Sequence, residues 1–308
     1  PGLRGERRGV LEAVVLGDAQ GVPGALEQRF RAAGISHLLV VSGEHVGVVG
    51  LGALWLALLL GVPRLGAEAV VLLALSGYVL AVGPHPSVIR AGIGGALGSL
   101  AWLTGRQRDA LYALEVAAVA LLAWNPYDVL DAGVQLSFAA VLAIFFLAPR
   151  FARALEGYPL PPGTRAGAAV AAACGLATAP VCWFQFHQIP LLTVPANLAA
   201  APTLVPMLGL AFASALVSPV APPLAHLLAW LNGWCAAYLA ACARLFGGLP
   251  GAQITSPRSA ALLALCVLGA AAYAWLRGRA RAEARLPAHR QRQAEDRASA
   301  AAAAGADR

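Results

Sequence analysis

Long apolar segments recur along most of this chain, and they constrain its fold more than any other feature. A helix needs about 20 apolar residues to cross a bilayer, and only helices and closed barrels satisfy their backbone there. Barrel strands alternate apolar and polar residues, whereas these segments are continuous. The sequence therefore predicts an all-α polytopic membrane protein with about nine transmembrane helices, some of them short, broken or re-entrant. We predict the spans at residues 36–60, 67–82, 87–104, 109–124, 131–148, 165–184, 191–217, 221–245 and 258–277.

Composition agrees with a membrane location and excludes one class of enzyme. Only 12% of the residues are charged, against about 25% in soluble domains. All 22 basic residues are Arg, so the chain has no P-loop, whose Lys contacts the nucleotide phosphates. The five Cys lie in or beside apolar segments without a C-x-x-C pair, which is typical of small packing residues.

The flanking segments differ from the apolar middle, and we predict three regions. Residues 1–35 form an extracytoplasmic lead-in, in which Pro23–Gly34 has the pattern of an amphipathic helix in the membrane interface. The alternative is an ordinary helix packed on the bundle. Residues 36–277 form the transmembrane domain, and residues 278–308 form an Arg/Ala-rich, disordered tail on the cytoplasmic side. Because the chain opens at Pro1, we expect it to be a fragment of a longer protein.

Polar side chains interrupt the first apolar segment. His37, Ser42, Glu44 and His45 all lie within residues 36–60. Such groups are costly in hydrocarbon, so they face a cavity, a partner or a pathway. A polar face toward a water-filled path is the preferred interpretation, and a helix-to-helix hydrogen-bond patch is the alternative.

The same residues raise the question of chemistry. On one continuous helix His37 and His45 are about 12 Å apart along the axis, too far to share a metal ion unless the helix breaks. We predict no metal site and no cofactor. Ser42 and His45, three residues apart, could form a nucleophile–base pair, so an intramembrane hydrolase stays open as an alternative.

Three further clusters place polar residues in apolar surroundings. Ser87 can cap a helix in which Arg90 lies one turn inside, where its fork would suit a phosphate; the alternative for Arg90 is snorkelling to the headgroups. Asp131, Gln135 and Ser137 form the next cluster, although an Asp at a helix start is also a plain N-cap. The last cluster contains Asn197 beside Pro195, as expected of a broken helix that lines a cavity.

Glycines accompany two of these clusters. Small residues let membrane helices approach closely, and we predict this packing role for Gly43, Gly47, Gly50, Gly92 and Gly95.

Taken in order, the four clusters resemble the ComEC/Rec2 competence family. The matching segments are SHLLVVSGEHVG (Ser36–Gly47), HPSVIRAGIGG (His85–Gly95), NPYDVLDAGVQLSFAAV (Asn125–Val141) and FHQIPLLTVPANLAAAP (Phe186–Pro202). The resemblance implies that residues 36–277 are the family's competence (channel) domain, which carries single-stranded DNA through the bacterial inner membrane into the cytoplasm during natural transformation. It also implies a DNA pathway along His37, Ser42, His45, Ser87, Arg90, Asp131, Gln135, Ser137 and Asn197.

The resemblance further implies partners. These are single-stranded DNA, the lipid bilayer, a DNA receptor outside the cell and a helicase-like motor in the cytosol. Family members also carry an OB-fold domain and a nuclease domain, which are not recognisable in this chain, so we expect a channel rather than an enzyme. Glu44 departs from the family, which usually has an apolar residue there. We expect Glu44 to face away from the path, to be paired or to stay protonated.

Other functions share some of these features. A secondary transporter of a small solute would also have broken helices and buried polar residues, but it predicts an inverted repeat, and none is convincing here. A passive anchor for soluble domains would not explain the cost of burying Arg90, His45 and Gln135.

Overall fold

The computed structural model describes residues 3–83, 85–105, 109–270, 272–273 and 277. The chain divides into two compact units, Pro1–Ile254 and Thr255–Arg308. The described part of the second unit contains the helix Pro257–Ala270, where the last span was predicted. The predicted tail, residues 278–308, lies outside the described residues.

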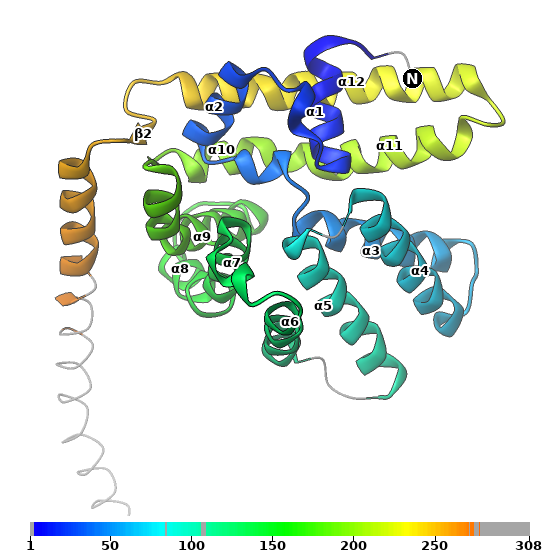
Figure 1. Ribbon diagram of the computed structural model, residues 1–308, viewed down its shortest axis with the longest axis horizontal. Coiled ribbons are helices and arrows are strands. Elements are labelled where there is room, and N and C mark those ends of the chain that lie inside the picture. The colour runs from blue at the N-terminus through cyan, green and yellow to red at the C-terminus, as the bar shows by residue number, and fades with distance from the viewer. Residues whose placement is uncertain (1–2, 84, 106–108, 271, 274–276, 278–308) are drawn as a thin grey trace, which may run out of the picture. The chain divides into compact units, whose positions relative to one another are not determined.

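The first unit is built almost entirely of helices (Figure 1). Its elements are α1 (Gly5–Leu16), η1 (Ala19–Gly21), α2 (Gly24–Ala33), η2 (Ser36–Leu39), α3 (Gly43–Leu59), α4 (Arg64–Val82), α5 (Pro86–Leu103), α6 (Ala110–Trp124), η3 (Pro126–Leu130), α7 (Ala132–Phe146), α8 (Ala148–Ala154), α9 (Pro162–Phe186), β1 (Ile189–Pro190), α10 (Thr193–Ala200), η4 (Ala201–Thr203), α11 (Leu204–Val217), α12 (Pro222–Gly248) and β2 (Gln253–Ile254).

The helices confirm an all-α polytopic membrane protein. Four helical segments are long and apolar enough to cross a membrane, namely α4, α9, Thr193–Val217 and α12. The pair α7 and α8, bent by 46°, would add a fifth, and α3, α6 and Pro257–Ala270 are shorter apolar helices. Each predicted span thus coincides with helical structure, while the number of crossings stays a prediction. The break or kink expected in residues 191–217 does not divide the span: Thr193–Val217 continues as one helical segment, in which the 3₁₀ turn η4 lies between α10 and α11.

The largest hydrophobic core joins α1, α2, α10, α11 and α12, which we call the α12 group. α11 and α12 lie side by side, and α1 and α2 pack against α12 (Figure 1). Phe30, Met207 and Leu239 are fully or almost fully buried in this core. The amphipathic segment at Pro23–Gly34 is therefore a helix whose apolar face packs on the bundle. Whether that helix also lies in the membrane interface stays a prediction.

Sequence patterns did not indicate α1. The helix buries Val10, Ala13 and Val14, and it lies close to the chain before α2 because Gly9 and Gly21 touch through their backbones. A Cβ at Gly9 would lie 2.1 Å from the Gly21 oxygen. This close approach has no periodic signature, which explains why the pattern of apolar residues missed it.

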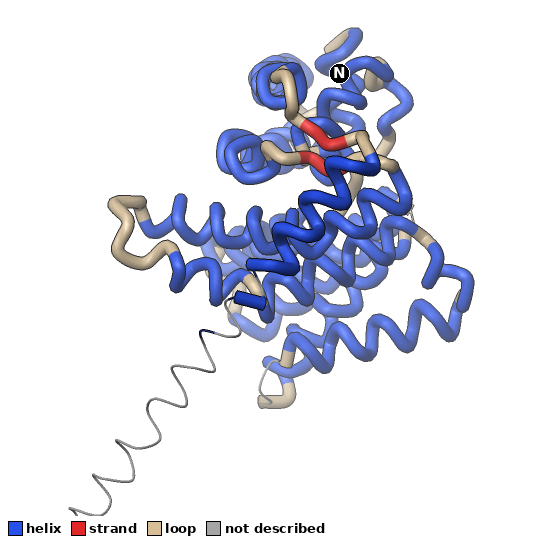
Figure 2. Tube along the Cα trace, turned by 90° about the vertical axis from the view of Figure 1, so that its left-hand side faces the viewer, coloured by secondary structure: helices blue, strands red, loops and turns tan. Residues whose placement is uncertain are grey.

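Two smaller cores hold the remaining helices of the first unit. The α3 group comprises α3, α4 and α5 around Val46, Val71 and Leu75, with α6 packed on α5. The α9 group comprises α7, α8 and α9 around Ala143, Ala148 and Ala173. A two-stranded antiparallel ribbon, β1 with β2, follows the end of α9 and pairs Ile189 with Ile254 (Figure 2).

Candidate functional site: a large cavity among the helices

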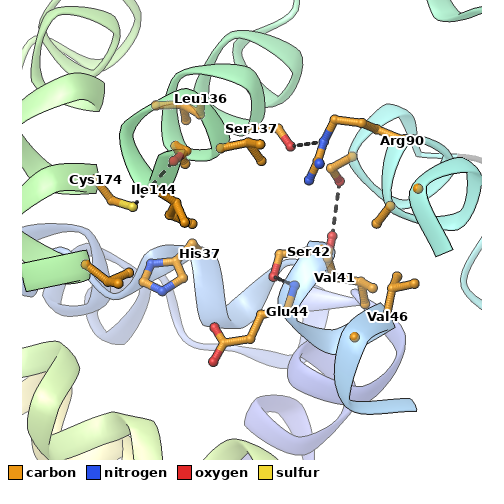
Figure 3. A pocket seen from close by; sticks show the side chains of 18 of the residues that line it. His37, Val41, Ser42, Glu44, Val46, Arg90, Leu136, Ser137, Ile144 and Cys174 are labelled. Carbon is orange, nitrogen blue, oxygen red and sulfur yellow. Dashed lines mark hydrogen bonds between the residues drawn. The ribbon is translucent and has the colours of Figure 1, made fainter. Parts of the chain in front are cut away.

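A cavity of about 1790 Å³ lies among the three helix groups and is called the large cavity below. Its walls are mainly apolar, and they come from every helix group of the first unit. Six of the predicted pathway residues line it, together with Glu44 (Figure 3). The six are His37, Ser42, Ser87, Arg90, Ser137 and Asn197.

The first polar segment is not one helix, which corrects the prediction for residues 36–60. The 3₁₀ turn η2 ends at Leu39, the chain is extended through Val40 and Ser42, and α3 begins at Gly43. Ser42 caps the new helix: its Oγ accepts the backbone N–H of Glu44 at 3.3 Å. A capping residue satisfies one of the N–H groups that a helix start leaves free. Ser42 and His45 therefore belong to the cap at the start of α3 and do not form a polar face along one helix.

His45 closes this cap and does not line the large cavity, and its place on a DNA pathway stays a prediction. Its side chain is fully buried, and Nδ1 accepts the Ser42 backbone N–H at 3.3 Å and lies 3.0 Å from Ser42 Oγ. The predicted Ser42–His45 contact thus exists. Nε2 is buried and has no hydrogen-bond partner among the described residues, so the third group that a hydrolase needs to orient His45 is missing from that part of the chain.

Arg90 reaches into the large cavity rather than toward solvent. Its Nε donates to Ser137 Oγ on α7 at 2.7 Å (Figure 3), and the side chain is half-buried. Gly43 makes room for it, since a Cβ there would lie 2.8 Å from Arg90 Nη2. Nearby, Ser87 Oγ donates to the Val41 carbonyl at 3.1 Å, which joins the start of α5 to the extended segment before α3.

Glu44 also lines the cavity, and the expectation that it faces away from a DNA path or stays protonated remains a prediction. The residue is exposed, and its carboxylate has neither an ion pair nor a hydrogen bond with any described side chain. In Figure 3, Glu44 and His37 extend from the segment that contains η2 and the start of α3, and Cys174 extends from α9. The cavity therefore carries a guanidinium and a carboxylate on different helices, α5 and α3.

Besides His45, two further predicted pathway residues lie outside the cavity wall. Asp131 is the N-cap of α7 and accepts the Val134 N–H at 2.9 Å. Gln135 donates to the Val129 carbonyl at 3.0 Å and accepts from Gln185 Nε2 at 3.1 Å. Asp131 thus caps the start of α7, and Gln135 links α7 to α9.

Asn197 lines the cavity and also holds two elements together. Its Nδ2 donates to the Gly34 carbonyl at 3.3 Å and to the Thr193 carbonyl at 2.7 Å. The first bond joins α10 to the end of α2, where Gly34 ends the helix in the left-handed region with φ 74°. A Cβ at Gly34 would lie 2.4 Å from Thr193 Oγ1, so the two segments meet closely.

The predicted packing glycines fall into two sets. A Cβ at Gly50 or Gly95 would lie 3.3 or 2.8 Å from Leu75, and one at Gly92 would lie 3.4 Å from Val79. These three glycines, like Gly43, let α3, α4 and α5 approach closely. Gly47 differs, because a Cβ there would meet no atom within 4 Å; it lies on the cavity wall instead.

Several cavity residues were missed by sequence reasoning. Glu68 on α4 is 2% exposed, accepts from Arg64 at 2.7 Å and accepts from Ser99 Oγ at 2.7 Å. The Arg–Glu spacing of four was the available signal. Arg31 and Phe186 also line the cavity: Arg31 lies in the predicted amphipathic segment Pro23–Gly34 and Phe186 begins the matching segment Phe186–Pro202, but neither was predicted as a pathway residue. Among the described residues, no group of three or more His, Cys, Asp or Glu could hold a metal ion.

Comparison with known proteins gives a consistent family. A family model described as "Competence protein" matches residues 14–280. The ComE operon protein 3 of Bacillus subtilis (strain 168) is 32% identical over 201 residues, which is 63% of this chain and 24% of that protein. The competence protein ComA of Neisseria gonorrhoeae is 32% identical over 151 residues, 45% of this chain and 21% of that protein. The chain thus matches less than a quarter of the length of either relative, and no solved structure matches it.

Proposed function

This chain belongs to the competence-protein family, and we propose that it forms the inner-membrane channel through which single-stranded DNA reaches the cytoplasm during natural transformation. The family supports a role in DNA uptake. The partners that go with this role are a DNA receptor outside the cell, a helicase-like motor in the cytosol, and OB-fold and nuclease domains beyond the matched region.

The observation that carries the proposal is the position of Arg90 in the large cavity. Among the described residues only Ser137 accepts a hydrogen bond from Arg90, and that bond uses Nε. The two Nη groups therefore remain for an anion. A guanidinium can donate two parallel hydrogen bonds to a phosphate, which is the repeating charge of a DNA strand.

The remaining walls suit passage rather than tight binding. Apolar side chains dominate the wall, and the predicted pathway residues on it other than Arg90 offer only hydroxyls, an imidazole and an amide: Ser42, Ser87, Ser137, His37 and Asn197. A conduit must let its cargo enter without trapping it. Arg90 and Arg31 lie on different helices, α5 and α2, and separate cations of this kind fit such a path better than a cluster of cations would.

The test is DNA uptake by a competence-deficient strain that carries the intact protein or a variant. Uptake is scored as labelled DNA that becomes protected from nuclease, at matched protein levels in the membrane. We expect Arg90→Ala to lower uptake about tenfold or more, since a charge-assisted hydrogen bond contributes about 1.5–3 kcal/mol.

The matched control is Arg153→Ala. Arg153 lies on α8, is exposed and does not line the large cavity. Its variant should keep the uptake of the parent protein. Equal uptake by Arg90→Ala and Arg153→Ala would contradict the proposed pathway.

A further inference from the structure

Two residues from distant parts of the chain meet on the wall of the large cavity. Arg31 lies in the last turn of α2, and Phe186 is the last residue of α9. Both line the cavity, and Arg31 Cζ lies 5.8 Å from the centroid of the Phe186 ring. The Arg31 side chain is 44% exposed and Phe186 is 40% exposed, so an incoming molecule can reach both.

The backbone holds this pair in place from both sides. His187 follows Phe186 in the left-handed region with φ 55°, which ends α9, and β1 then pairs with β2. On the other side α2 packs on α12, and its end is bound to α10 by the Asn197–Gly34 hydrogen bond. The ring and the guanidinium are therefore presented by elements fixed to one another.

Arg31 is bound only loosely by its neighbour. Glu27, one turn earlier on α2, accepts from Arg31 Nη2 at 2.5 Å, and 37% of the Glu27 side chain is exposed. Exposed ion pairs of this i, i+4 kind contribute little stability. A phosphate could therefore displace the carboxylate from Arg31.

An aromatic ring beside an exposed Arg is the usual means of holding a single strand. Bases stack on aromatic rings whatever their sequence, and Arg adds charge and stacking of its own. We infer that Arg31 and Phe186 form a nucleotide-binding platform on the wall of the large cavity, where a base of single-stranded DNA stacks on Phe186 and its phosphate pairs with Arg31. This inference rests on the proposed DNA channel. It adds a first binding site for the strand where the strand enters the large cavity.

The platform is tested by equilibrium binding of a fluorescein-labelled oligothymidine strand to the purified intact protein, followed by anisotropy. Phe186→Ala should weaken binding about tenfold, because base–aromatic stacking is of that order, whereas Phe186→Trp should bind like the parent. Arg31→Gln should weaken binding and lower the slope of log K against log salt by about 0.7.

Glu27→Gln gives a result that misfolding cannot imitate. Removing this carboxylate frees Arg31 and removes a repulsive charge, so this variant should bind the strand more tightly than the parent. If Phe186→Ala binds like the parent, or Glu27→Gln does not bind more tightly, the platform is wrong.

The chain offers a matched control for each position. Phe184 lies two residues earlier on α9, is 78% exposed and does not line the cavity. Arg8 and Glu12 form an equivalent exposed i, i+4 pair on α1, also away from the cavity wall. Phe184→Ala, Arg8→Gln and Glu12→Gln should all bind like the parent.

Uptake assays separate this inference from the channel itself. If Arg90→Ala loses uptake while Phe186→Ala and Arg31→Gln match the parent in both binding and uptake, the channel stands and the platform is rejected. If the parent protein neither binds the strand nor restores uptake, the channel proposal fails, and the platform fails with it.

Discussion

Ser42 has two roles: it caps α3, and it lines the large cavity. The cap explains why a polar Ser and His stand at the start of an apolar helix: Ser42 Oγ and His45 Nδ1 each accept a backbone N–H. An N–H group left without a partner in apolar surroundings is costly. Ser42 and His45 could be taken for a catalytic pair, but their side chains accept the backbone N–H groups at the start of α3.

Replacing Ser42 should reveal this structural contribution. We expect Ser42→Ala to lower the free energy of unfolding by about 1 kcal/mol, the usual value of an N-cap, and Ser42→Asn to retain most of it. Thermal unfolding in detergent, followed by circular dichroism, measures both. If Ser42→Ala is as stable as Ser42→Asn, the cap does not stabilise α3.

At the scale of elements, α2 is held against α12 by direct contact of backbones. A Cβ at Gly247 would lie 2.2 Å from the Arg29 oxygen. Arg29 Nη1 also donates to the Gly247 carbonyl at 2.9 Å. Backbone atoms cannot move aside as a flexible side chain can, so this contact sets the position of α2 and with it that of Arg31.

Neighbouring glycines test the contact. Gly247→Ala should destabilise the protein by about 1–3 kcal/mol, the usual cost of forcing extra atoms into a packed site. Gly248→Ala is the control, since a Cβ at Gly248 would meet only Arg29 Nη1, at 3.5 Å. The difference in unfolding temperature between the two variants is the measurement. Equal stabilities would contradict a backbone contact between α2 and α12.

At the scale of the first unit, three separate cores surround a cavity instead of merging into one. Many of the contacts within these cores use Ala and Gly. This is expected in a membrane, where the hydrophobic effect does not drive helices together and close packing of small residues stabilises their association instead. Polar side chains on the cavity wall then face a space that water can fill, which lowers the cost of their burial.

Cysteine labelling tests whether that space is aqueous. Cys182 lines the large cavity, whereas Cys242 is buried in the core of the α12 group. With the other cysteines replaced, a charged, water-soluble thiol reagent should modify the Cys182-only protein faster than the Cys242-only protein, because reaction requires access. Equal rates would mean that the cavity does not admit water-soluble molecules.

Much of the helical layout could be predicted from hydropathy, and the reason is visible in particular elements. α4 and α9 begin and end within three residues of their predicted spans at 67–82 and 165–184, because the bilayer requires long apolar helices. Residues 36–60 were predicted wrongly as one helix. Apolarity continues through Val40 and Val41, while only the cap at Ser42 marks where α3 begins.

The amino-acid sequence by itself determined the all-α membrane class, the approximate spans and the family, because each depends on local composition or on short ordered motifs. Tertiary structure alone decided which polar residues share a cavity. Arg90 and Ser137 are 47 positions apart and meet at 2.7 Å, whereas His45, only three residues from Ser42, turns into the protein interior. Side-chain direction depends on where helices break and pack, and neither can be read from residue type.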